Sequence, residues 1–69
     1  MKRFIIKNGT EIEVFSFENE SIGNQFEEKI CNSLNNPEIH KFIAIILGGE
    51  KIILPTEYLQ NSIIKIDMI

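Results

Sequence analysis

The sequence predicts an α+β fold in which a mixed sheet of four to five strands packs on one helix. Three observations predict it. Two alternating apolar runs flank Asn8-Gly9, apolar residues recur every four positions from Ile22 to Leu34, and short apolar runs fill the chain from Phe42 onward. Alternation is typical of half-buried strands, and a recurrence every four residues is typical of an amphipathic helix.

The first segment, RFIIKNGTEIEVF, is predicted to be a β-hairpin because Asn-Gly between alternating runs is a strong turn signal. A two-residue loop would set Lys7 opposite Thr10, and each face would then mix apolar and acidic groups. A three-residue loop, Lys7-Asn8-Gly9, places Gly9 in the left-handed conformation. It also gathers four apolar side chains on one face, namely Phe4, Ile6, Ile12 and Val14. We favour the three-residue loop because it separates the two faces.

The helix is predicted over SIGNQFEEKICNSLNNP, where charged residues separate the members of an apolar stripe. That stripe consists of Ile22, Phe26, Ile30 and Leu34. Ser21 is the expected N-cap, and the run Asn35-Asn36-Pro37 is expected to end the helix.

Three further strands follow. FIAIIL, residues 42–47, is apolar throughout, which is typical of a strand covered on both faces. Gly48-Gly49 predicts a turn with positive φ, and KIIL, residues 51–54, predicts a short fourth strand. Pro55 is expected at the first position of a single helical turn. SIIKIDMI then closes as the fifth strand, with Ile64, Ile66 and Met68 on one side.

One arrangement buries all of these apolar stripes. The helix crosses one face of the sheet, and the fifth strand lies parallel to the first in the middle of that sheet. The helix then covers Phe4, Ile6, Ile64 and Ile66. This arrangement is a β-grasp, and residues 1–69 are predicted to form a single domain.

In this order of elements the chain resembles ubiquitin and its relatives along its whole length. MKRFIIKNGTEIEVF is similar to the N-terminal hairpin, NESIGNQFEEKI to the helix entry, and LGGEKI with TEYLQNSIIKIDMI to the Tyr-containing turn and final strand. The resemblance implies a ubiquitin-like domain. Conjugated members and the related sulfur carriers work through a tail ending in Gly-Gly, whereas this sequence ends in Asp67-Met68-Ile69. We therefore expect a ubiquitin-like protein that lacks the reactive tail.

Composition argues against several classes of function. The net charge of −3 is unsuited to a sequence-independent nucleic-acid binder, which needs a basic face. No apolar run reaches the roughly 18 residues of a membrane span, and the N-terminus lacks a signal-peptide core, so we expect a cytoplasmic protein. Cys31 and His40 are too few ligands for a metal site. No catalytic constellation or cofactor motif is evident, so an enzyme is not predicted.

Three single residues have simple structural interpretations. His40 is expected in a loop beside Lys41, because no nucleophile accompanies it. Cys31 is expected to be a small buried apolar group next to Ile30, rather than a reactive thiol. The Tyr58 hydroxyl is expected to cap nearby backbone in the last turn.

The outer face of the sheet is the predicted binding surface. If Ile43, Ile45 and Leu47 point toward the helix, then alternate side chains of the same strand point away. The resemblance implies that this face binds partners around an exposed isoleucine of the third strand, which is Ile46 here. The predicted protein-binding residues are Ile5, Phe42, Ala44, Ile46 and Ile63.

Three hypotheses for function remain open. The first is a small non-catalytic protein-binding module, an accessory or regulatory protein of a bacterium or phage, which binds another protein or a second copy of itself. The second is a sulfur-carrier or conjugation-type carrier that works with an activating enzyme, and the missing Gly-Gly argues against it. The third is a small inhibitor from a phage or mobile element.

Overall fold

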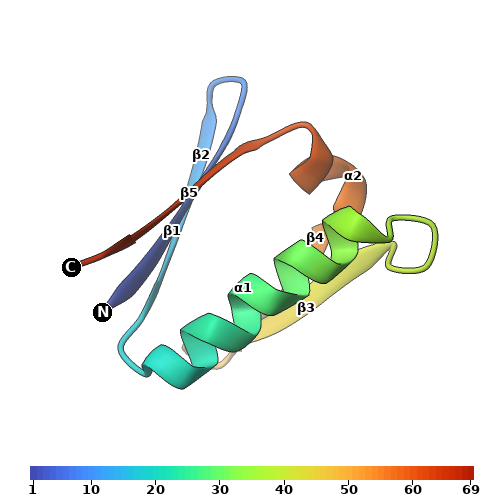
Figure 1. Cartoon of the computed structure of the whole chain (residues 1–69). Helices are drawn as coiled ribbons and strands as arrows, with labels where there is room; N and C mark the ends of the chain where they lie inside the picture. Colours follow the sequence, from blue (N-terminus) through green and yellow to red (C-terminus); the bar gives the residue numbers. More distant parts are fainter.

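Seven elements follow one another in the computed structural model, which describes residues 1–69 (Figure 1). In chain order they are β1 (Lys2–Asn8), β2 (Glu11–Phe17), α1 (Glu20–Asn35), β3 (Phe42–Leu47), β4 (Glu50–Pro55), α2 (Thr56–Gln60) and β5 (Ile63–Met68). The α+β class is confirmed, and each expected strand and helix is present within a few residues of its predicted bounds.

The strands form two antiparallel sheets, one of three strands in the order β2-β1-β5 and one made of β3 and β4. The prediction of one mixed sheet with β5 parallel to β1 is therefore wrong. β5 does lie beside β1, but it runs antiparallel, with Phe4 opposite Ile66 and Ile6 opposite Ile64. As predicted, these two residues of β5 share a face with Phe4 and Ile6, but Ile66 remains exposed.

The direction of β5 follows from where α2 delivers the chain. The side-chain amide of Asn8, at the far end of β1, donates to the Tyr58 carbonyl at 3.3 Å and to the Ser62 hydroxyl at 3.2 Å. β5 consequently begins beside Lys7, at the hairpin end of β1. A parallel strand would have to start at the opposite end of β1, beside Lys2, and not at the hairpin end where the chain leaves α2.

The β1–β2 hairpin has a two-residue loop, Gly9-Thr10, closed by Asn8 opposite Glu11. Neither loop considered from the sequence has this register. Gly9 is left-handed as expected, with φ of 61°, and it occupies the first loop position, which suits glycine in a type II′ turn. Phe4 therefore lies opposite Phe15 rather than Ile12.

The changed register moves aromatic residues into the core. Phe15 and Phe17 are buried, whereas Ile12 and Val14 are exposed on the outer face of the sheet. The predicted second strand of the hairpin ended at Phe15, but β2 continues to Phe17. Two phenylalanines bury more apolar surface than an isoleucine and a valine, so this register is the better solution.

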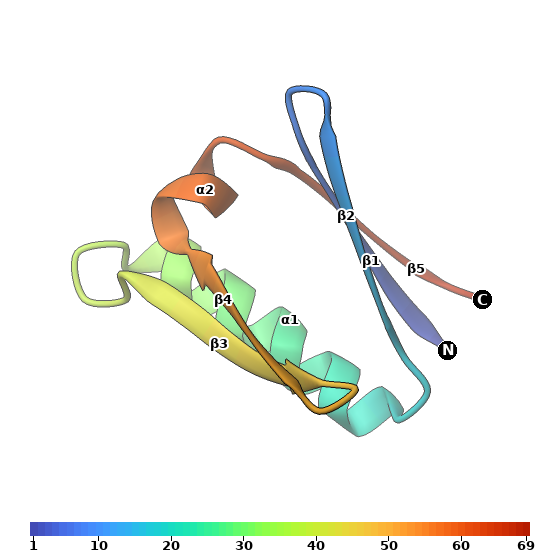
Figure 2. The same cartoon turned by 180° about the vertical axis from the view of Figure 1, so that it is seen from behind.

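Phe26 of α1 joins the helix to the three-stranded sheet. Its ring centroid lies 4.7 Å from Phe4, 5.3 Å from Phe17 and 5.8 Å from Phe15. On its other side α1 runs along one face of the β3–β4 hairpin, as Figures 1 and 2 show from opposite sides. Inward side chains of this hairpin complete the core, chiefly Ile43, Ile45 and Leu54.

The start of α1 differs from expectation in its cap. Asn19, not Ser21, is the N-cap, and its side-chain oxygen accepts from the amides of Ser21 at 2.9 Å and Ile22 at 3.3 Å. Gly23 is buried against Lys2. A Cβ at this position would lie 3.1 Å from Lys2 Cδ, so the glycine lets β1 approach the helix closely.

The β3–β4 turn confirms the expected role of its glycines. Gly48 and Gly49 have φ of 59° and 81°, the two positive values that a type I′ turn requires. Two smaller expectations are corrected here. β3 is covered on one face only, and Pro55 ends β4 as the N-cap of α2 instead of opening the helix.

Candidate protein-binding surfaces

The five side chains predicted to bind a partner lie on two different sheets. Phe42, Ala44 and Ile46 occupy the outer face of the β3–β4 hairpin. Ile5 and Ile63 occupy the outer face of the β2-β1-β5 sheet. The structure therefore does not join them into one patch, because the two sheets share no strand pairing.

The predicted parity of β3 is confirmed. Ile43 and Ile45 are buried, while Phe42 is 58% exposed and Ile46 is 75% exposed. Ile53, which is not among the predicted residues, lies directly opposite Ala44 and is also exposed. The alternation within KIIL could have revealed it, since Leu54 faces inward. We call the outward set the hairpin face; it consists of Phe42, Ala44, Ile46, Ile53 and Pro55.

Basic side chains flank the hairpin face. The Lys29 ammonium group donates to the Ala44 carbonyl at 3.2 Å, on the edge of β3 that β4 does not cover. Lys51 lies directly opposite Ile46. The hollows between α1 and β3 on this side of the molecule are lined by both lysines and by no carboxylate. The surroundings of the hairpin face are thus apolar and positively charged.

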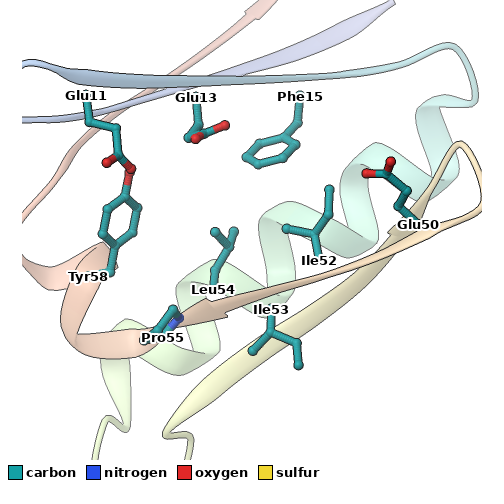
Figure 3. A pocket seen from close by; sticks show the side chains of 9 residues that line it. All are labelled: Glu11, Glu13, Phe15, Glu50, Ile52, Ile53, Leu54, Pro55 and Tyr58. Carbon is teal, nitrogen blue, oxygen red and sulfur yellow. The ribbon is translucent and has the colours of Figure 1, made fainter.

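A groove of about 450 Å³ separates β2 from β4, and Figure 3 shows the side chains that line it. Its floor is apolar, with Phe15 and Leu54 facing each other from the two strands. Its rim carries the carboxylates of Glu11, Glu13 and Glu50. No basic residue lines it, so this groove and the hollows between α1 and β3 are bordered by opposite charges.

Tyr58 closes one end of this groove. Its hydroxyl donates to the Glu11 carboxylate at 3.0 Å, as Figure 3 indicates, so the expectation that it caps backbone is wrong. Partial burial, followed by the hydrogen bond and the negative charges of Glu11 and Glu13, raises the pKa of Tyr58 above its usual value of 10.0. The sequence could not reveal this contact, because Tyr58 and Glu11 are 47 positions apart.

A bidentate ion pair marks the outer face of the β2-β1-β5 sheet. Arg3 Nε lies 2.9 Å from Asp67 Oδ1, and Arg3 Nη2 lies 2.6 Å from Asp67 Oδ2. The hydrogen bonds from Arg3 are the main cause that lowers the pKa of Asp67 below 3.8, and the same bonds raise the pKa of Arg3. Asp67 is thereby held as a carboxylate across the physiological range.

The remaining candidate residues are dispersed. Cys31 is exposed, so the expectation that it is buried is wrong; the buried small residue on this part of α1 is Ser33, whose hydroxyl donates to the Ile30 carbonyl at 2.9 Å. His40 lies exposed in the loop before β3. No group of three or more His, Cys, Asp or Glu side chains converges as metal ligands would. Neither helix has an apolar stretch of sufficient length to span a bilayer.

These features define a small α+β protein with one main helix, a three-stranded and a two-stranded antiparallel sheet, and an exposed apolar hairpin. Comparison with protein-family models, with curated proteins and with solved structures finds no match to this chain. Its function must therefore be argued from its own surfaces.

Proposed function

We propose that this protein is a small non-catalytic protein-binding module that acts through the hairpin face. The observation that carries the proposal is the exposure of Phe42, Ile46 and Ile53 side by side on one hairpin. A domain of 69 residues has few apolar side chains to spare from its core. Grouped exposed apolar side chains are a common mark of an interaction site.

The chemistry around the hairpin face indicates the kind of partner. Lys29 and Lys51 lie at its margin, and no acidic side chain lines the adjoining hollows. Protein interfaces commonly have an apolar centre and a polar rim of complementary charge. The partner that fits best is a protein with an apolar patch bordered by carboxylates.

We also propose a ubiquitin-like relationship, which is supported by the order of the elements and by the exposed Ile46 on β3. The antiparallel β5 and the separate β3–β4 sheet argue against it. Backbone NMR contacts test the two possibilities. Contacts between Lys2 and Met68 support the antiparallel arrangement, while contacts between Lys2 and Ile63 would indicate a β-grasp. The cytoplasmic location remains a prediction.

The decisive experiment compares Ile46→Asp with a matched control, Ile12→Asp. Both side chains are exposed isoleucines on strands, but Ile12 lies on the other sheet. The unmodified chain and Ile12→Asp should capture the same proteins from the native cell. Ile46→Asp should fail to capture them. An affinity loss of at least tenfold, which corresponds to about 1.4 kcal/mol, is expected for a central contact residue.

Folding must be checked in the same experiment. Ile46→Asp should leave the circular dichroism melt nearly unchanged, because an outward side chain leaves no cavity in the core. Equal loss of capture by both variants would show non-specific adhesion. Unchanged capture by folded Ile46→Asp would remove the hairpin face as the binding site.

A further inference from the structure

We propose that β5 pairs with β5 of a second copy of this chain, antiparallel and centred on Ile66. This surface is separate from the hairpin face, so the proposal goes beyond the function proposed above. It joins two three-stranded sheets into one six-stranded sheet, in the order β2-β1-β5-β5-β1-β2.

The outward edge of β5 has no partner within the chain. β5 is the last strand of its sheet, and it pairs only with β1. Next to β5, the Ser62 amide donates back to the Leu59 carbonyl at 3.2 Å, and the Ile69 amide donates to the Met1 carbonyl at 2.9 Å, which extends the pairing with β1. The opposite edge therefore offers free amides and carbonyls.

β5 carries only one of the devices that usually protect an edge strand, the outward charges of Lys65 and Asp67. The other devices, which are proline, bulges, short length and inward charges, are absent from it. β5 has six residues without proline or glycine, and its inward side chains are the apolar Ile64, Ile66 and Met68. The edge of β3, in contrast, is covered where Lys29 donates to the Ala44 carbonyl. Apolar side chains in and next to β5 are exposed, with Ile63 and Ile69 each 64% exposed.

Side-chain parity limits how two copies of β5 could pair. Residues directly opposite each other in an antiparallel pair point to the same face. The two-fold axis is perpendicular to the sheet, and it must therefore pass midway between the two copies of one β5 residue. Outer residues then meet outer residues, and inner residues meet inner residues.

Charge then selects among these registers. Centring the axis on Lys65 would oppose two lysines, and centring it on Asp67 would oppose two aspartates. Centring it on Ile64 would place Lys65 opposite Ile63 and leave both charges unmatched. Only the register centred on Ile66 sets Lys65 opposite Asp67 of the second copy, and the symmetry makes this pair twice.

The same register matches the inner face. Ile66 meets Ile66 of the second copy, and Ile64 meets Met68. Arg3 already holds the Asp67 carboxylate in place on the outer face. Two carboxylate oxygens can accept about four hydrogen bonds, so two acceptor positions remain for the incoming lysine. The contact is closed by its own two-fold symmetry, which favours a dimer over a fibre.

Disulfide trapping tests the register directly. In a Cys31→Ser background, which removes the single exposed thiol, Ile66→Cys should form a covalent dimer under mild oxidation. The residue on the two-fold axis faces itself at a Cα separation of about 4.5–5.5 Å, within the range of about 4.4–6.8 Å that disulfides allow. Ile64→Cys is the matched control, because it faces Met68 and should not crosslink. Equal crosslinking by both variants, or none by Ile66→Cys, would overturn the proposal.

A charge exchange tests the chemistry without any crosslink. Lys65→Glu alone and Asp67→Lys alone should each sediment as monomers, since each places like charges opposite one another twice. An equal mixture of the two should recover the dimer, because every introduced charge then meets its opposite.

Asp67→Lys also loses its contact with Arg3, so Arg3→Glu combined with Asp67→Lys provides a second version that restores an ion pair within the chain. Folded variants that remain monomeric after mixing, or that remain dimeric alone, would refute the pairing. Ile46→Asp should not alter sedimentation, which separates failure of this proposal from failure of the hairpin face.

Discussion

The Arg3 guanidinium and the Asp67 carboxylate meet in a two-point ion pair across β1 and β5, although 64 positions separate them in the chain. The pair joins the first strand to the last on the outer face of the sheet. Its two parallel hydrogen bonds fix the relative position of these strands, so it bears directly on the antiparallel register of β5.

The first prediction concerns acid stability. The pKa of Asp67 is lower in the folded protein than in the unfolded chain, so its contribution is present above the unfolded value of about 3.9 and is lost as pH falls through the folded value. Asp67→Asn should therefore lower the melting temperature by a constant amount from pH 5 upward, and the difference should shrink below about pH 4. Melts are recorded at concentrations where the protein is monomeric, and a pH-independent difference would contradict the ion pair.

The second prediction uses the single tyrosine of the chain. Because the pKa of Tyr58 is raised, its contribution to stability is complete below the unfolded value of about 10 and is lost as pH rises through the folded value. With no tryptophan and one tyrosine, tyrosinate absorbance reports Tyr58 alone. The titration midpoint should lie above 10 in the native protein and should fall toward that value in Glu11→Gln. Identical midpoints would contradict the Tyr58–Glu11 hydrogen bond.

The third prediction concerns the aromatic core. Phe26→Ala removes the ring that contacts Phe4, Phe15 and Phe17, and truncating a buried phenylalanine costs about 3–5 kcal/mol. A domain of this size has a total free energy of unfolding of the same order. The variant should therefore be largely unfolded even before urea is added, which a urea titration measures. Ile22→Ala, on the same helix but exposed, should change the free energy of unfolding by less than about 0.5 kcal/mol.

The fourth prediction tests how α2 is held. Asn8→Ala deletes the hydrogen bonds to the Tyr58 carbonyl and the Ser62 hydroxyl, each worth about 1 kcal/mol. Amide hydrogen exchange should accelerate in residues 58–62 and at the start of β5. Asn24→Ala is the control, since the Asn24 side chain accepts a hydrogen bond from the Lys2 ammonium group and not from any residue of α2. Uniform acceleration in both variants would argue against a specific tether at Asn8.

Local sequence patterns predicted the positions of the helices and strands well. They predicted the pairing of distant strands less well. The four-residue recurrence through Phe26 and Ile30 located α1, and both residues are buried. Gly48-Gly49 located the second turn, because positive φ is a property of single residues. The parity of β3 identified Ile46 as outward for the same local reason.

The errors in sheet topology and in the binding surface concern contacts between distant segments. The direction of β5 depends on the Asn8 tether to α2, which joins residues 50 and 54 positions apart. The register of the first hairpin depends on Phe17 reaching Phe26, and that contact required the helix to be placed first. The predicted binding residues lie on two sheets because β3 and β5 belong to different sheets, which no local pattern in the sequence indicates.

The separation of the β3–β4 hairpin from the β2-β1-β5 sheet has a consequence for valency. Because the two sheets share no strand, pairing along β5 leaves the hairpin face of each copy uncovered. A β5-paired assembly would then present two identical docking sites at a fixed spacing. A partner that is itself repeated or clustered would be retained by avidity, with a gain of about 10²–10⁴ over a single site. The same divided sheet that departs from the expected fold would thus let one small chain act as a bivalent adaptor.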